Sequence, residues 1–220
     1  MFPEEYFQES FPLTWTYLNT FKEELFKRSI NGSKDPKWYQ YGRSQSLTRF
    51  HNTQKLIWAV LSTEPGYIFD ENNLQFTGGG NGPYYSMFTS SNYSLYYILG
   101  IIAHPIFEAM VKSGASEFRG AYYSHSKQFV ENLPIRQIDF TNDDEAKLHN
   151  DIVITVKKLI ATKVTYNGIY IVAKKKIMQH KLEFLFNSLI TQINSLYGIS
   201  LEEMNQVLND ESLVNELNED

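Results

Sequence analysis

The 220-residue sequence contains no cysteine. This absence excludes a disulfide framework, a thiolate nucleophile and a cysteine-based zinc site, and it disfavours secretion. The five histidines are scattered and have no spacing typical of metal ligands. The sequence also lacks the apolar run of ~18 residues that a membrane-spanning helix needs, and its start lacks the segments of a signal peptide. We therefore expect a cytoplasmic protein without a membrane partner.

The overall composition is typical of a folded globular chain. Hydrophobic residues make up 42% and charged residues 20%, which excludes a disordered or collagen-like protein. Aromatic residues are abundant at 15%, including 15 Tyr and 15 Phe. Because aromatic side chains combine apolar area with a polar edge, this excess is consistent with aromatic residues on a binding surface.

Charge is distributed unevenly along the chain, although the formal net charge is only −5. Residues 22–55 carry a net charge of +5 and residues 147–181 a net charge of +7, whereas residues 202–220 hold seven acids and no base. The acidity is thus concentrated in a C-terminal tail that can point away from a ligand. The two basic blocks allow a polyanionic partner, which evenly spread charges would argue against.

The first two thirds of the chain predict a helix followed by an α+β region. Apolar residues recur at helical spacing over residues 11–29. Residues 55–62 and 84–89 are typical of strands, with a glycine-rich loop at residues 78–83 between them. An apolar helix is expected over residues 94–103, because good capping residues precede it.

The last third of the chain predicts long helices. Residues 141–144 form a cap with acids in the first turn, and an amphipathic helix follows up to a turn at residues 166–168. The next helix carries apolar residues at steps of three and four and stops at Gly198. Residues 200–203 form a capping box, which predicts a further short helix.

Together these elements predict an α+β fold in three parts. Residues 1–30 are expected to form an N-terminal bracing helix, and residues 31–140 a lobe built on a small mixed sheet. Residues 141–220 are expected to form an antiparallel helical pair that ends in the acidic tail. The lobe is the part in which we expect most of the binding residues.

Several short segments, taken in order, resemble one known family. They are residues 11–18, Leu25 and Arg28, the string Trp38-Tyr39-Gln40-Tyr41-Gly42-Arg43-Ser44-Gln45, and residues 55–57, 77–79, 84–85, 95–102, 129–135 and 193–200. They resemble the TaqI-like C-terminal specificity domain, which is the target recognition domain of type IIG restriction-modification enzymes and adenine-specific DNA methyltransferases. The likeness spans nearly the whole chain. One departure is Ala103-His104-Pro105, where the family pattern has an asparagine-serine pair.

The resemblance implies a role in DNA recognition, and it also shows which parts of such an enzyme this sequence lacks. Family members carry an upstream methyltransferase domain with an Asn-Pro-Pro-Tyr type motif and a glycine-rich S-adenosylmethionine loop, and this sequence has neither motif. We therefore expect a C-terminal fragment of a longer enzyme that binds DNA and does no chemistry by itself. Its partners would be double-stranded DNA and the methyltransferase domain of the same parent chain. S-adenosylmethionine would bind to that domain, and this chain would hold no cofactor.

The candidate DNA contacts fall in three clusters and one loop. The first cluster comprises Lys37, Trp38, Tyr39, Tyr41, Arg43, Gln45 and Arg49. The second comprises Arg119, Tyr122, His125 and Lys127, the third comprises Lys174, Lys175 and Lys176, and Asn81 lies in the glycine-rich loop. Arg and Gln can bond to guanine and adenine edges, aromatic rings can stack on bases, and Lys can bind phosphates.

Other interpretations of these residues stay open. The aromatic residues of the first cluster are equally typical of a protein core, the glycine-rich loop of a plain hairpin connection, and the three lysines of a solvated helix end. No Gly-Lys-Ser/Thr follows the glycine-rich loop, so it does not match a nucleotide-binding P-loop. Ser124 and His125 are neighbours on a strand and point to opposite faces, so we do not expect them to form a catalytic pair.

The function predicted from the sequence is sequence-specific recognition of double-stranded DNA. In the full enzyme, the module would present the target adenine to the methyltransferase domain, which must flip that base out of the duplex. The alternatives are a type I-like DNA specificity subunit, a helical scaffold for a partner protein, and a nucleotide enzyme that uses the glycine-rich loop. A type I subunit would need two lobes, and a single lobe in 220 residues argues against it.

Overall fold

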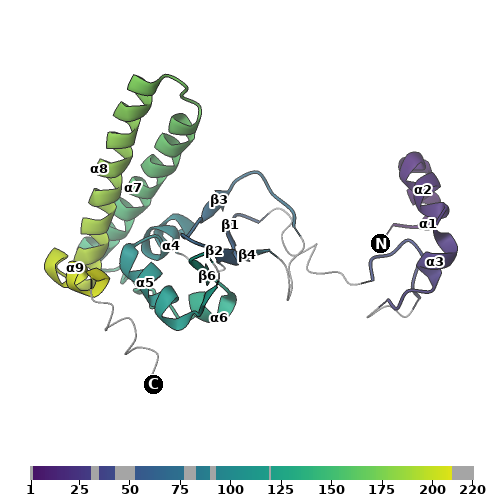
Figure 1. Ribbon diagram of the computed structural model, residues 1–220, viewed down its shortest axis with the longest axis horizontal. Helices are drawn as coiled ribbons and strands as arrows, with labels where there is room; N and C mark the ends of the chain where they lie inside the picture. The colour runs from purple at the N-terminus through teal and green to yellow at the C-terminus, as the bar shows by residue number, and fades with distance from the viewer. Residues whose placement is uncertain are drawn as a thin grey trace. The chain divides into compact units, whose positions relative to one another are not determined.

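The computed structural model describes residues 2–30, 35–42, 53–76, 83–89, 93–118 and 120–209. The chain divides into two compact units, Met1–Arg49 and Phe50–Asp220, which we call the N-terminal and C-terminal units. The N-terminal unit (purple in Figure 1) contains α1 (Glu4–Ser10), α2 (Pro12–Asn19) and α3 (Lys22–Phe26). The C-terminal unit contains all the other described helices and all the described strands.

Short helices form in the N-terminal unit where the sequence predicted a single helix over residues 11–29. α1 ends before Phe11, because a residue that precedes a proline avoids the helical conformation, and Phe11 has φ −135° and ψ 57°. Pro12 then opens α2, since a proline is accepted in the first turn of a helix. α2 ends next to Thr20, whose hydroxyl donates to the carbonyl of Tyr17 at 2.6 Å and competes with the helical backbone bonds. The prediction of one long helix was wrong.

Aromatic rings hold the N-terminal unit together. Ring centroids 5.1 to 6.4 Å apart link Phe2, Phe7, Phe11, Trp15, Trp38 and Tyr39. Arg28 fixes residues 35–42 next to α3, because its guanidinium donates to the carbonyls of Trp38 and Gln40, both at 2.9 Å. Trp38 is only 3% exposed, and its indole N–H donates to Glu4 at 3.2 Å. Trp38 therefore belongs to the core of this unit, and Arg28 holds the backbone of residues 38–40 against α3.

Two small sheets lie in the C-terminal unit. Sheet A has the strand order β3 (Ile68–Asp70), β1 (Lys55–Ala59), β4 (Tyr84–Met87), and sheet B has the order β2 (Leu61–Ser62), β6 (Tyr122–Ser124), β5 (Glu117–Phe118). Leu56 of β1 is paired with Phe69 on one side and Met87 on the other. All pairings among the described strands are antiparallel. The α+β class is confirmed, but the sheets are antiparallel where a mixed sheet was expected.

The chain passes from sheet A to sheet B at Val60. The N–H of Val60 donates to the carbonyl of Pro83 at 2.9 Å, and its own carbonyl accepts from the backbone N–H of His125 at 2.6 Å. The indole of Trp58 adds a further link by donating to the carbonyl of His125 at 2.8 Å. The strand predicted over residues 55–62 is therefore present as two consecutive strands that belong to different sheets.

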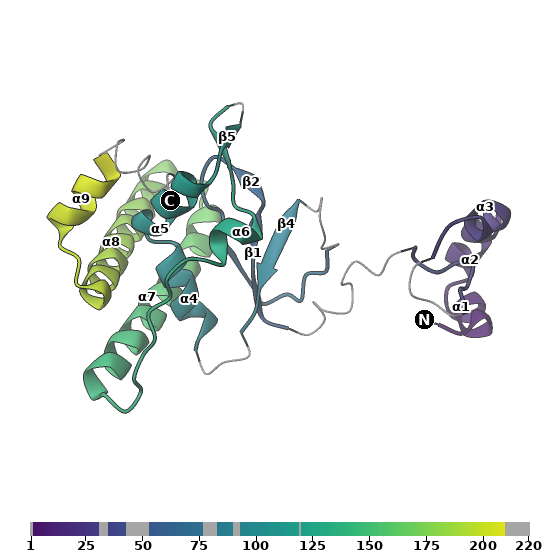
Figure 2. The same cartoon turned by 90° about the horizontal axis from the view of Figure 1, so that it is seen from below.

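Helix α4 (Leu95–Ile102) lies at the centre of the hydrophobic core. It lies between β1 and the pair formed by α7 (Asp143–Asn167) and α8 (Val172–Tyr197), and α5 (Pro105–Gly114) follows it (Figures 1 and 2). Seven of its eight residues are buried, and the hydroxyl of Ser94 accepts the N–H of Tyr96 at its start. The predicted apolar helix is confirmed. One core cluster contains side chains from both sides of residue 140, so the strands and the long helices form one packed body.

Helices α7 and α8 form the antiparallel pair that the sequence predicted. The side chain of Asn142 caps α7. Gly198 ends α8 in the left-handed conformation with φ +69°, which glycine adopts without strain. The side chains of Ser200 and Glu203 form the predicted capping box at the start of α9 (Leu201–Asn209). Only one end of this hairpin packs near α4 and α9, and the other end extends away from them (Figure 1).

The segment Ala103-His104-Pro105 forms a helix boundary. His104 caps α5, because its Nδ1 accepts the backbone N–H of Ile106 at 3.3 Å, and Pro105 takes the first helical position. Helices α4 and α5 meet at a bend of 68°. Within the described part of the chain, no single helix is long and apolar enough to span a membrane. Helices α4 and α5 have the required length and apolar character only when they are taken together as this bent pair.

A buried ion pair joins β1 and β3. Lys55 and Asp70 face each other in the strand register, both side chains are 0% exposed, and the Lys55 ammonium bonds to Oδ2 of Asp70. The backbone N–H groups of Asn72 and Leu74 donate to the same carboxylate at 2.9 and 3.0 Å. Burial alone would raise the pKa of Asp70, but the hydrogen bonds from Lys55 and from these two amides outweigh burial and lower the pKa.

Replacing Gly100 by alanine should destabilise the C-terminal unit. A Cβ at this position would lie 2.9 Å from Cγ2 of Ile152 and 3.1 Å from Cγ2 of Val156, so α7 would have to move away from α4. Overpacking of this kind costs about 1 to 3 kcal/mol, which urea denaturation followed by circular dichroism would measure. Gly66→Ala is the matched control, because nothing lies within 4 Å of the added Cβ. Equal denaturation midpoints for the two variants would contradict the tight packing.

Replacing Asp70 by asparagine should destabilise the protein at pH 7 by about 3 to 5 kcal/mol, because Lys55 would stay buried without its counter-charge. The pKa of Asp70 is lower in the folded than in the unfolded chain. The stabilisation from its carboxylate is therefore complete above the unfolded pKa of about 3.9 and is lost as the pH falls through the folded pKa. Urea denaturation from pH 7 to pH 3 should show the difference between wild type and variant shrinking.

The control for this experiment is Glu64→Gln, which removes an exposed acid that follows β2. It should change the free energy of unfolding by less than about 0.5 kcal/mol at either pH. The double variant Lys55→Met with Asp70→Leu removes both buried charges, so it should recover much of the loss. A difference between wild type and Asp70→Asn that does not depend on pH would contradict the role assigned to the carboxylate.

Candidate nucleic-acid interface

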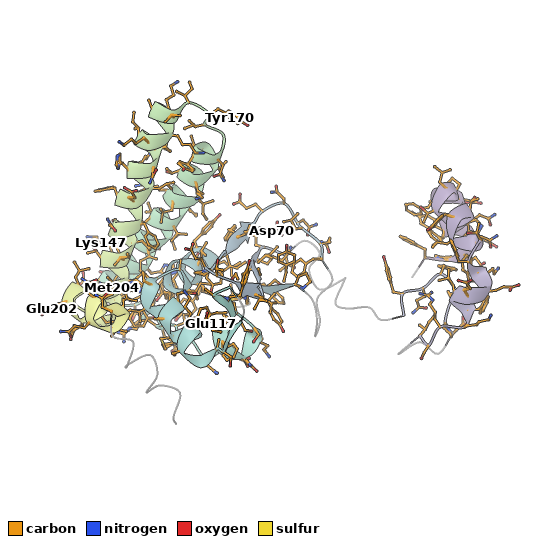
Figure 3. All side chains as sticks on the ribbon, viewed as in Figure 1. Asp70, Glu117, Lys147, Tyr170, Glu202 and Met204 are labelled. Atoms are coloured by element: carbon orange, nitrogen blue, oxygen red, sulfur yellow. The ribbon has the colours of Figure 1, made fainter. Side chains whose placement is uncertain are left out.

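The described candidate contacts lie in three separate places. The N-terminal unit contains Lys37, Trp38, Tyr39 and Tyr41. Tyr122 is on β6, His125 lies just after β6, and Lys127 opens α6 (Lys127–Val130). The first turns of α8 contain Lys174, Lys175 and Lys176. Arg43, Gln45, Arg49, Asn81 and Arg119 lie outside the described residues. Figure 3 shows Tyr170, just before α8, at the far end of the hairpin from Glu117 of sheet B. The second and third clusters therefore occupy different parts of the C-terminal unit.

In the N-terminal unit, the first cluster is partly used for folding. The rings of Trp38 and Tyr39 belong to the aromatic core, and the Tyr39 hydroxyl donates to the carbonyl of Phe2 at 2.9 Å. Lys37 donates to Asp35 at 2.7 Å, and this hydrogen bond raises the pKa of the lysine. Tyr41 is exposed. Of these four side chains, Tyr41 is the most accessible to a ligand.

The second cluster differs in exposure from one residue to the next. Tyr122 on β6 is exposed, and Lys127 extends into solvent at the start of α6, where it bonds to Glu131 at 3.2 Å. His125 between them is only 1% exposed. Tyr122 and Lys127 can reach a ligand as they stand, whereas the His125 ring is covered by other side chains.

The buried imidazole of His125 contacts two other elements. Its Nε2 lies 3.1 Å from both carboxylate oxygens of Glu108 on α5. Its Nδ1 lies 3.1 Å from the hydroxyl oxygen of Ser62 on β2 and 3.2 Å from the carbonyl oxygen of Tyr123. Because a carboxylate only accepts hydrogen bonds, Nε2 is the nitrogen that donates to Glu108. In the neutral ring, Nδ1 then accepts from the Ser62 hydroxyl.

Neither partner of His125 was predicted from the sequence. Ser124 is its neighbour in the chain, whereas the hydroxyl that meets the ring comes from Ser62. Glu108 is an isolated acid on α5, and helical spacing alone does not show what lies opposite it. Ser62, His125 and Glu108 follow one another as the serine, histidine and acid of a hydrolase triad do. The His125 imidazole is buried, however, so a substrate cannot reach it. The arrangement therefore favours a structural role. In the described part of the chain, no group of three or more His, Asp and Glu residues is placed to hold a metal ion.

The third cluster lies at the free end of the hairpin. Lys174, Lys175 and Lys176 are exposed at the start of α8, where no acid lies in the first turn and no side chain caps the helix. Positive charge is unfavourable at a helix N-terminus and anions are favourable there. The ammonium of Lys175 lies 4.9 Å from the ring centroid of Tyr166. The third cluster therefore combines several cations with helix N–H groups that lack a side-chain cap.

Exposed apolar side chains accompany these lysines. Tyr170 is 91% exposed in the loop between the helices, and Val164, Val172, Ile177 and Phe184 are also exposed. Isolated exposed apolar residues are common on protein surfaces, and a contiguous patch of them often marks a contact with another molecule. The far half of the hairpin is thus both basic and apolar.

Comparison with curated proteins relates this chain to restriction-modification enzymes. It is similar to the type II restriction enzyme and methyltransferase RM.Eco57I of Escherichia coli, with 28% identity over 151 residues. The match covers 66% of this chain but only 15% of the relative, so this chain spans a small part of the relative's length. No family model matches the chain.

Proposed function

We propose that this chain is a DNA sequence-recognition module of a restriction-modification enzyme, and that its parent is an adenine-N6 DNA methyltransferase. The observation that carries the proposal is the similarity to a small part of a type II restriction enzyme and methyltransferase. The segments that resemble a TaqI-like specificity domain support the same role. The methyltransferase domain, with its S-adenosylmethionine, would lie elsewhere in the parent chain and receive an adenine flipped out of the duplex.

Phosphate contacts would provide most of the affinity for DNA. Lys174, Lys175 and Lys176 are suited to this task, because they are exposed and lie at a helix N-terminus that favours anions. Such contacts position a protein on the duplex and carry no sequence information directly. This part of the binding should therefore be similar for all DNA sequences and strongly dependent on salt.

Base edges would be bound by side chains of the first and second clusters. Arg43 and Gln45 are proposed for this role on their chemistry, since Arg pairs bidentately with guanine and Gln with adenine. In the C-terminal unit, Tyr122 and Lys127 are exposed among the described members of the second cluster. His125 is not proposed as a direct contact, because its ring is buried.

A protein-interaction scaffold remains the second candidate function. The exposed apolar residues of the hairpin, led by Tyr170 and Val172, favour it, because phosphate contacts do not require them. The two functions are compatible if the hairpin also contacts the methyltransferase domain of the parent chain. They are distinguished by whether the chain binds DNA by itself.

We expect the chain to bind duplex DNA weakly, in the non-specific range of about 10⁻⁴ to 10⁻⁶ M, with a strong dependence on salt. Replacing Lys174, Lys175 and Lys176 together by glutamine should weaken binding to all sequences alike. Fluorescence anisotropy at several salt concentrations should show the slope of log K against log salt becoming less steep, by up to about 0.9 for each lost phosphate contact.

The control for the triple variant is Lys147→Gln, at the other end of the hairpin (Figure 3). This lysine belongs to the same basic block of the sequence. The variant therefore tests whether the salt dependence of DNA binding is set by where a lysine lies on the hairpin or only by the total charge. The slope should stay close to that of the wild type. An unchanged slope in the triple variant would remove these lysines from the interface, and a chain that binds no DNA even at low salt would favour the scaffold.

We also expect no methyl transfer from the chain alone. The sequence has neither the Asn-Pro-Pro-Tyr type motif nor the S-adenosylmethionine loop of an adenine methyltransferase. Incubation with labelled S-adenosylmethionine and DNA should give no more incorporation than a reaction without protein. An active adenine methyltransferase is the positive control. Incorporation that depends on this chain would contradict its assignment as a recognition module.

A further inference from the structure

Sheet B is too small to be stable without support from other elements. Its strands contain two, three and two residues, so few backbone hydrogen bonds join them. Sheets of this size need packing against other elements to be stable. The exposed side chains Tyr122 and Lys127 lie on this sheet and directly after it. Their positions therefore depend on whatever fixes β6 to the rest of the unit.

His125 provides that attachment through both its backbone and its ring. Its N–H donates to Val60 at 2.6 Å, and its carbonyl accepts from the indole of Trp58 at 2.8 Å. The ring joins Ser62 on one side and Glu108 on the other, each at 3.1 Å. A single residue thus links β6 to β1, β2 and α5.

Helix α5 offers a rigid support for this link. Phe107 and Val111, which flank Glu108 on the helix, are buried in the hydrophobic core. Lys112, one turn after Glu108, lies 3.4 Å from its carboxylate and 5.3 Å from the ring centroid of Tyr123 on β6. The Glu108 carboxylate is therefore held between His125 and Lys112 on a helix that is anchored in the core.

We propose that Glu108 and His125 are positioning residues for base discrimination by the segment from Tyr122 to Lys127. Glu108 fixes the His125 ring, the ring fixes β6, and β6 sets the direction in which Tyr122 and Lys127 meet the DNA. Neither Glu108 nor the His125 ring touches the nucleic acid. This inference rests on the proposed function and adds to it the residues that determine its specificity.

A positioning role for Glu108 and His125 has other consequences than direct DNA contact or added stability. If His125 contacted DNA directly, a substitution of Glu108 would affect DNA binding only by changing the charge of the His125 ring. If the link only added stability, its loss would weaken binding to every sequence in proportion to the unfolded fraction. A positioning role instead predicts that discrimination falls while the folded fraction and the sequence-independent affinity hardly change.

The experiment compares variants of the full chain on two duplexes. The wild type first selects a preferred duplex from a randomised pool, and a scrambled duplex of the same composition serves as reference. Affinities are measured by anisotropy at a temperature at which circular dichroism shows every variant folded. Glu108→Ala should lower the preferred-to-scrambled ratio by about tenfold, the discrimination that one well-placed base contact provides, with the scrambled affinity nearly unchanged. Glu108→Gln keeps an oxygen that accepts from His125, so it should restore most of the ratio.

Hydrogen exchange tests the positioning without reference to DNA. In Glu108→Ala, amides of β5, β6 and α6 should exchange faster than in the wild type, while amides of α7 and α8 should not change. Glu117→Ala is the matched control, since it removes an exposed acid from β5 of the same sheet. This control should alter neither exchange nor discrimination.

The possible outcomes separate the inference from the function on which it rests. A wild-type chain that binds no DNA even at low salt overturns the proposed function and this inference with it. A wild-type chain that binds DNA but prefers no duplex overturns the inference alone. A wild type that selects a duplex, together with a Glu108→Ala variant that keeps its discrimination, overturns the inference alone. Unchanged exchange in β6, or equal loss of affinity for both duplexes, also overturns it.

Discussion

The close approach of α7 to α4 at Gly100 is the constraint on which the C-terminal unit depends. Because Gly100 has no side chain, the methyl groups of Ile152 and Val156 pack against the backbone of α4. α4, α7, α8 and β1 can then share one core. This contact supports only one end of the hairpin, and apolar residues at the other end, such as Tyr170, stay exposed. The hairpin can therefore extend its lysine-rich end far from the sheets while its base stays fixed.

A second, polar constraint controls the small strands. Sheet A is fixed by apolar packing of β1 on α4 and by the buried pair of Lys55 and Asp70. No described side chain of sheet B belongs to the core cluster, and hydrogen bonds of His125 to Val60 and Trp58 join the sheet to β1. Polar links of this kind are directional, so they fix orientation more strictly than apolar contacts do. This difference explains why one histidine can control the geometry of a whole strand.

Features set by neighbouring residues could be predicted from the sequence, whereas pairings between distant residues could not. The cap at Asn142, the left-handed end at Gly198 and the capping box at residues 200–203 follow local rules, and all are present. The Lys55–Asp70 pair and the contact of His125 with Glu108 were missed, because spacing shows which face a side chain occupies but not what it meets there. The candidate contacts were named from side-chain chemistry, local charge and the family resemblance, none of which gives information on burial.

Burial also changes how the basic blocks should be interpreted. In residues 22–55, Lys55 is buried against Asp70, and Arg28 donates to backbone carbonyls. A cation that already has such partners gains little from a phosphate, since its existing hydrogen bonds must be lost. The lysines at residues 174–176 differ, because an anion there relieves an unfavourable interaction with the helix N-terminus. We therefore propose that the hairpin provides sequence-independent affinity, and that in the C-terminal unit the segment held by His125 provides discrimination.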